Sequence, residues 1–110
     1  YLHVEAPDEA GHGGNISEKI KAIEEIDEKI LGQLLECRKT FPDIRIALLP
    51  DHATPIKVGT HTSDPVPFAI WGTGIEPDAV PAFSEEECGK GRYRTRPGHK
   101  FMPLLLSGND

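Results

Sequence analysis

The sequence predicts an α/β protein with three layers, in which helices flank a mainly parallel sheet. Three features carry this prediction: a short apolar stretch at Tyr1–Val4, a long amphipathic segment over residues 15–39, and an apolar run over residues 44–49. Strand, long helix and strand in this order form a βαβ unit, whose strands are parallel and whose crossover is right-handed. A nearly continuous apolar run is typical of a strand that is buried on both faces of such a sheet.

The long helix is the clearest predicted element. Isoleucine and leucine recur mostly at steps of three and four residues throughout this segment, and Glu and Lys fill the other positions, as expected for a helix with one apolar face. Asn15 can cap the first turn, with Glu18 three residues later. Pro42 cannot continue a helix, so we expect the helix to end near Lys39.

The remaining predicted elements are shorter. Residues 5–14, between the first strand and the helix, are rich in Gly, Pro and acidic residues and are predicted to form a loop. Phe68–Gly72 is a third apolar run, predicted to be a strand that begins after two prolines. Ser84 can cap a short helical turn over the glutamates that follow it. His99–Leu106 is predicted to be a terminal helix with Pro103 in its first turn.

Composition limits the class of protein. With 110 residues, of which 37% are hydrophobic and 27% charged, the chain resembles one soluble globular domain. Its net charge of −6 argues against a nucleic-acid or anionic-membrane partner, because both need clustered Lys and Arg. No apolar stretch approaches the ~20 residues that cross a bilayer, and the N-terminus has no signal-peptide pattern. Cys37 and Cys88 fit neither a disulfide framework nor a zinc ribbon. We therefore expect a cytoplasmic protein; the sequence predicts no particular oligomeric state.

The start of the sequence suggests a longer protein. Residue 1 is Tyr1 rather than Met, and no turn precedes the predicted first strand. A fold that opened in mid-strand would leave this strand short and its neighbours open to pairing with another chain. We therefore expect the missing part to lie upstream.

Polar side chains follow both predicted strands of the βαβ unit. Asp8 and His12 come after the first strand, Asp51 and His52 come directly after the second, and His61 follows nine residues later. Ligands of open α/β sheets bind beyond the carboxyl ends of the strands, so we expect these side chains at one edge of the sheet. A carboxylate and an imidazole together suit a divalent first-row cation. The adjacent Asp-His pair alone is weaker evidence, since such a pair is commonly just a turn.

Three segments together resemble a known family. They are Glu5–His12, Asp51–Pro55 and His61–Phe68, which read EAPDEAGH, DHATP and HTSDPVPF. They resemble the cofactor-independent phosphoglycerate mutases of the archaeal type, members of the alkaline phosphatase superfamily of metalloenzymes. The resemblance spans nearly the whole chain. It implies that residues 1–110 are the C-terminal portion of a metal-binding, alkaline-phosphatase-like domain, whose N-terminal portion and inserted domain lie upstream.

The resemblance also implies the ligands of two divalent metal ions, with manganese or zinc suited to such carboxylate and imidazole ligands. Asp8, His12 and His61 correspond to the ligands of one ion. Asp51 and His52 correspond to ligands of the second ion, whose set is incomplete in this chain. The family adds an Asp and a nucleophilic Ser from the upstream portion. No catalytic or substrate-binding residue is assigned here, because none of the serines stands in a matching context: Ser17, Ser63, Ser84 and Ser107.

The activity implied by the resemblance is that of an isomerase. In the family, two metal ions activate a serine that takes phosphate from one hydroxyl of glycerate and returns it to the other. The resemblance thus implies a fragment of a 2,3-bisphosphoglycerate-independent phosphoglycerate mutase. Such an enzyme interconverts 3-phosphoglycerate and 2-phosphoglycerate in glycolysis and gluconeogenesis through a phosphoserine intermediate, and its partner is this small phosphorylated substrate. We expect this chain alone to be inactive, because the nucleophile lies elsewhere.

Two alternatives stay open at this point. The same ligands would serve another phosphoryl-transfer enzyme of the superfamily, a phosphatase or a phosphopentomutase, because most substrate contacts are expected upstream. A non-catalytic metal-binding module is the other alternative. Arg92, Arg94 and Arg96 form a basic group that is either plain surface or a site for a substrate anion. The two remaining histidines, His3 and His99, match no ligand position.

Overall fold

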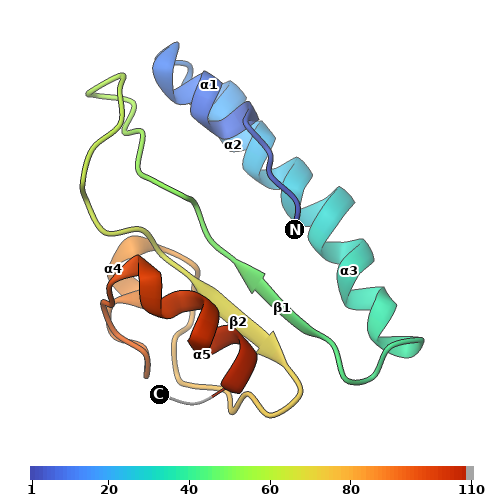
Figure 1. The fold of residues 1–110 in the computed structure, drawn as a ribbon. Helices are drawn as coiled ribbons and strands as arrows, with labels where there is room; N and C mark the ends of the chain where they lie inside the picture. The colour runs from blue at the N-terminus through green and yellow to red at the C-terminus, as the bar shows by residue number, and fades with distance from the viewer. Residues whose placement is uncertain (109–110) are drawn as a thin grey trace. The chain divides into compact units, whose positions relative to one another are not determined.

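The computed structural model describes residues 1–108, which form two compact units. The first unit contains residues 1–40 and 52–64, and the second contains residues 41–51 and the chain from Pro65 onward. Helices and strands both occur, so the α/β class is confirmed (Figure 1).

The long helix predicted from the sequence is confirmed in the first unit, and a shorter helix precedes it (Figure 1). The Asn15 side chain accepts a hydrogen bond from the Glu18 N–H (3.1 Å) and caps the first turn, as predicted. The middle of the helix widens into a π-turn, where the Gly32 N–H donates to the Asp27 carbonyl. The elements of this unit are α1 (Ala6–His12), α2 (Ile16–Glu25), the π-helix η1 (Ile26–Leu31), α3 (Gly32–Glu36) and the 3₁₀-helix η2 (Cys37–Lys39).

Two predictions for the start of the chain are wrong. Tyr1–Val4 form no strand, and the segment expected to be a loop contains helix α1. Pro7 stands at the beginning of α1, where its missing N–H removes no intrahelical hydrogen bond. Asp8 and Glu9 place negative charge at the positive end of the helix dipole. The proline and glycines that suggested a loop therefore mark the two ends of this helix.

A glycine turn reverses the chain between α1 and α2. Gly14 has a left-handed backbone (φ 67°), and its N–H donates to the Gly11 carbonyl (3.2 Å). The Asn15 N–H donates to the Ala10 carbonyl (3.0 Å), which completes a Schellman ending of α1. Asn15 thus ends one helix with its backbone and begins the next with its side chain. The corner between the two helices depends on this residue.

The second unit contains a two-stranded sheet (Figure 1). Strands β1 (Arg45–Leu48) and β2 (Ala69–Gly72) lie within the two runs predicted to be strands, so both predictions are confirmed. The strands pair antiparallel, with Arg45 opposite Gly72. The mainly parallel, three-layer sheet is therefore not confirmed in residues 1–108. That prediction depended on the strand expected at Tyr1–Val4, which does not form.

Three short helical segments follow the sheet: α4 (Glu85–Cys88), the 3₁₀-helix η3 (Gly98–Lys100) and α5 (Phe101–Ser107). Ser84 caps α4 as predicted, since its hydroxyl accepts a hydrogen bond from the Glu87 N–H (3.3 Å). The predicted terminal helix is confirmed as α5.

Arg45 connects the sheet to α5 within the second unit. Its Nε donates to the Thr73 carbonyl (2.6 Å) just after β2. Its Nη1 donates to the carbonyls of Leu105 (2.9 Å) and Leu106 (2.7 Å). The last carbonyls of a helix have no intrahelical partner, and a positive charge there complements the helix dipole. One guanidinium therefore completes the end of α5 and holds it to the sheet.

Few side chains are buried in either unit. Among residues 1–108, the buried apolar side chains are those of Ala10, Ile46, Pro67 and Leu104. Fifteen large apolar side chains are exposed, including Ile16 and Ile20 on α2. A helix with an apolar face normally packs that face against another element. Hydrogen bonds at turns and helix ends therefore define these units more than a hydrophobic core does. Within the described chain, no helix is long and apolar enough to span a membrane.

Replacing Arg45 with Met should remove all three hydrogen bonds to Thr73, Leu105 and Leu106 while keeping an apolar stem. We expect the free energy of unfolding to fall by about 2 kcal/mol, because hydrogen bonds to a charged group are among the stronger ones. Urea denaturation followed by the fluorescence of Trp71, the single tryptophan, measures this in the second unit. Lys57→Met, at an exposed position of the first unit, is the control. Equal urea midpoints for the two variants would contradict the role of Arg45.

Candidate metal centre

The loop over residues 52–62 folds back on itself in the first unit. Its two arms join at an antiparallel bridge, where the Thr62 N–H donates to the Ala53 carbonyl (3.0 Å). His52 and His61 each stand next to a bridged residue. Their rings consequently lie against each other, with 3.7 Å between centroids and 31° between planes. A backbone hydrogen bond therefore brings together two imidazoles that are nine residues apart in sequence.

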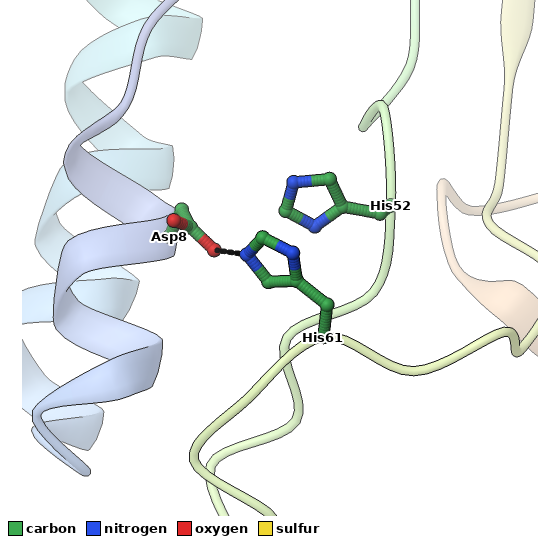
Figure 2. A group of neighbouring side chains, drawn as sticks. All are labelled: Asp8, His52 and His61. Carbon is green, nitrogen blue, oxygen red and sulfur yellow. Dashed lines mark ion pairs between the residues drawn. The ribbon is translucent and has the colours of Figure 1, made fainter.

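Helix α1 places two further polar side chains beside this loop. Asp8 and His12 are four residues apart and so lie on the same face of the helix. Figure 2 shows Asp8 reaching from the helix toward His61, with His52 beside it. One oxygen of Asp8 lies 3.3 Å from His61 Nε2, and its other oxygen lies 3.4 Å from His12 Nε2. The two Nε2 atoms of His12 and His61 are 3.1 Å apart.

These three distances are close to the spacing of ligands around one cation, with a different oxygen of Asp8 facing each imidazole. Ligand atoms at about 2.0–2.1 Å from a tetrahedral metal ion lie roughly 3.3 Å from one another. Asp8, His12 and His61 present atoms 3.1–3.4 Å apart. A second set of three ligand atoms, one from each of Asp8, His52 and His61, lies within 4.8 Å of one another. Four side chains thus converge from one helix and one loop, with a donor set that suits a divalent first-row metal.

The ring of His12 is oriented by the loop backbone. Its Nδ1 lies 2.9 Å from the carbonyl oxygen of Gly59, which has a left-handed backbone (φ 70°). A carbonyl only accepts hydrogen bonds, so Nδ1 is the donor and Nε2 of the neutral ring carries the lone pair. Histidine ligands commonly have such an outer partner, which fixes the ring and the tautomer. His12 therefore presents the correct nitrogen toward Asp8 and His61.

The electrostatics favour an ionised Asp8. The Thr54 hydroxyl donates to Asp8 Oδ1 (2.6 Å), and this hydrogen bond is the main reason that the pKa of Asp8 lies below its usual value. Partial burial opposes the shift in pKa, and the electrostatic influence of the neighbouring imidazoles of His12, His61 and His52 adds to it. A carboxylate that stays ionised is ready to hold a cation.

The centre is open to solvent. The side chains of Asp8, His12 and His61 are 34%, 42% and 51% exposed. Structural zinc sites are closed by four protein ligands, whereas catalytic sites keep a position for water or substrate. These side chains are therefore accessible from solvent in this chain.

The residues predicted from the sequence are largely brought together. Asp8, His12, His52 and His61 converge within the first unit, whereas Asp51 is exposed and belongs to the second unit. Sequence reasoning missed Thr54, to which it assigned no role in the site. The available signal was its position two residues after His52, in a segment where the neighbouring polar residues were already candidate ligands.

An open centre of one carboxylate and three imidazoles on an α/β chain is typical of a metal-dependent enzyme. The chain belongs to the metalloenzyme superfamily, whose family model matches residues 1–107. The resemblance inferred from the three sequence segments is confirmed, because curated relatives of this chain have the name of that family.

Two curated relatives have the name 2,3-bisphosphoglycerate-independent phosphoglycerate mutase. The relative from Methanothrix thermoacetophila is 46% identical over 98% of this chain and 28% of its own length. The relative from Methanosarcina mazei is 50% identical over 96% of this chain and 27% of its own length. The chain therefore spans little more than a quarter of these relatives. The solved structure of the PH0037 protein from Pyrococcus horikoshii is also similar, with a TM-score of 0.86 and 33% identity over 96% of this chain and 31% of that one.

Gly11 lets helix α1 approach the loop closely enough to form the centre. A Cβ at Gly11 would lie 2.8 Å from the Thr54 carbonyl oxygen and 3.0 Å from Thr54 Cγ2. Gly11→Ala should therefore push the helix from the loop and lower the free energy of unfolding by about 1–3 kcal/mol, as overpacking does. Urea denaturation followed by circular dichroism measures the loss.

Gly13→Ala is the matched control for this prediction. The nearest atom to a Cβ at Gly13 is the Glu9 carbonyl oxygen at 3.5 Å, which is an ordinary contact. We expect Gly13→Ala to unfold near the urea midpoint of the unchanged chain. If Gly11→Ala also did so, the close packing of α1 on Thr54 would be wrong.

Proposed function

We propose that this chain supplies metal ligands to a 2,3-bisphosphoglycerate-independent phosphoglycerate mutase, which interconverts 3-phosphoglycerate and 2-phosphoglycerate. The convergence of Asp8 with His12, His52 and His61 is the observation that carries the proposal. The names of the relatives from Methanothrix and Methanosarcina support the choice of reaction. The reaction belongs to glycolysis and gluconeogenesis, so we expect the enzyme in the cytoplasm.

Two divalent ions, manganese or zinc, are proposed as the cofactors. Asp8, His12 and His61 are proposed to hold one ion; the 3.1 Å between the two Nε2 atoms, and the 3.3 Å and 3.4 Å from these atoms to the two Asp8 oxygens, support this assignment. His52 and Asp51 contribute to the second ion, whose remaining ligands come from the rest of the enzyme. The position of the His52 ring against His61 supports two neighbouring sites.

The residues of this chain prepare the site for phosphoryl transfer. Two bound cations lower the pKa of an attacking hydroxyl and hold the oxygens of the phosphoryl group. Asp8 contributes a negative charge that Thr54 helps to keep ionised. His12 presents Nε2 because Gly59 holds its Nδ1. The open side of the centre leaves room for a small phosphorylated substrate. The nucleophilic serine comes from another part of the enzyme, so this chain alone is inactive.

The chain is proposed to be the C-terminal portion of a larger alkaline-phosphatase-like domain. Its N-terminal portion and an inserted domain come from the rest of the enzyme, and together the portions form a three-layer, mainly parallel sheet with flanking helices. The exposed apolar side chains support this proposal, because Ile16, Ile20 and Ile23 of α2 are 61%, 52% and 53% exposed. Apolar faces of this kind are normally covered.

A chimeric enzyme tests the proposed function. The matching 28% of the Methanothrix thermoacetophila enzyme is replaced by this chain, and conversion of 3-phosphoglycerate to 2-phosphoglycerate is followed with manganese present. We expect activity within about tenfold of that enzyme. Adding His12→Ala and His61→Ala should lower it by roughly 1,000-fold or more, since two ligands of one ion are lost.

The control changes the two histidines outside the centre. His3→Ala with His99→Ala also removes two imidazoles, and it should leave the activity of the chimera unchanged. A folded chimera that hydrolysed phosphate esters without isomerising phosphoglycerate would indicate a phosphatase of the superfamily instead. A folded chimera with neither activity would contradict the proposed function.

A further inference from the structure

Thr54 is the buried polar residue of the described chain. Only 6% of its surface is exposed, although the ligands around it are half-exposed. Its hydroxyl makes two contacts, 2.6 Å to Asp8 Oδ1 and 3.2 Å to His52 Nδ1. Buried polar groups are normally satisfied by hydrogen bonds, and here both partners are candidate metal ligands. One hydroxyl thus joins the ligand sets proposed for two different ions.

The single proton of the Thr54 hydroxyl determines which nitrogen of His52 is protonated. A hydroxyl has a single proton, and Thr54 donates it to the carboxylate of Asp8. The contact with His52 is then a hydrogen bond only if Nδ1 of the ring is the donor. In the neutral ring, the proton is consequently on Nδ1 and the lone pair is on Nε2.

The position of Thr54 is fixed by groups other than the ligands. The Lys19 Nζ donates to the Thr54 carbonyl oxygen (2.6 Å) and so connects α2 to the loop. Gly11 packs directly on Thr54 from the side of α1, as its close approach shows. The neighbouring Ala53 is paired with Thr62. The backbone of Thr54 is therefore fixed by groups other than the two ligands that its hydroxyl contacts.

We propose that Thr54 is a positioning residue, whose hydroxyl orients Asp8 and holds His52 in the Nδ1–H tautomer, which leaves the lone pair of Nε2 available for a divalent cation. This inference rests on the proposed function for the identity of the ligands. Outer partners of metal ligands typically fix ring orientation and tautomer in this way. Here a single threonine does so for a carboxylate and an imidazole together.

The test compares Thr54→Val, which keeps the shape and loses the hydroxyl, with Thr54→Ser, which restores it. ¹⁵N NMR of the metal-free chain at about pH 8, where imidazoles are mostly neutral, reports which ring nitrogen carries the proton. His52→Gln identifies the signals of that ring. We expect the Nδ1–H tautomer in the unchanged chain and in Thr54→Ser, and loss of this preference in Thr54→Val.

Calorimetric titration with Mn²⁺ is the second readout. Thr54→Val should weaken binding about 10- to 100-fold, as the loss of an outer partner does, and Thr54→Ser should restore it to within roughly threefold. Thr62→Val is the matched control in the same loop, since its hydroxyl donates to Asp64 rather than to a ligand. It should bind Mn²⁺ as the unchanged chain does.

The outcomes separate this inference from the proposed function. If the unchanged chain binds Mn²⁺ and Thr54→Val binds equally well, the role of Thr54 is wrong while the metal centre stands. If the unchanged chain binds no Mn²⁺, metal binding by this chain fails, and the NMR result alone decides the role of Thr54. A proton on Nε2 of His52 in the unchanged chain overturns the inference in either case, even if Thr54→Val does not fold.

Discussion

The close packing of helix α1 on the loop over residues 52–62 is the constraint on which the candidate centre depends. The helix supplies two of the four converging side chains and the loop supplies the other two, so neither element forms the centre alone. Gly11 permits the approach because any larger residue would meet Thr54. The hydrogen bond from Thr54 to Asp8 then fixes the two elements to each other.

Hydrogen bonds rather than a hydrophobic core determine the local structure of both units. Asn15 joins two helices, and Arg45 joins a helix to the sheet. Such hydrogen bonds orient neighbouring elements well, but they stabilise a folded chain less than extensive apolar burial does. The apolar faces of the helices remain exposed among the described residues. The chain matches little more than a quarter of the length of its relatives from Methanothrix and Methanosarcina.

The helices and strands that short, local sequence patterns determine could be predicted from the sequence. The helix capped by Asn15, the turn capped by Ser84 and the strand β1 were all predicted correctly. Helix α1 was not, because a seven-residue helix is too short to show an apolar period, and only Pro7 and its acidic neighbours marked it. The antiparallel pairing of β1 with β2 depends on contacts far apart in sequence, which no local pattern contains. Ligand types were readable from residue chemistry, whereas the role of Thr54 required its distances to Asp8 and His52.

In the proposed centre, Asp8, His12 and His61 share one divalent cation. The most direct measurement is anomalous X-ray diffraction from crystals of this chain grown with zinc. A shared zinc ion should give an anomalous peak at about 2.0–2.2 Å from an Asp8 oxygen and from the Nε2 atoms of His12 and His61. Zinc bound only at other histidines, such as His3 or His99, or no ordered zinc with the four side chains in place, would contradict it.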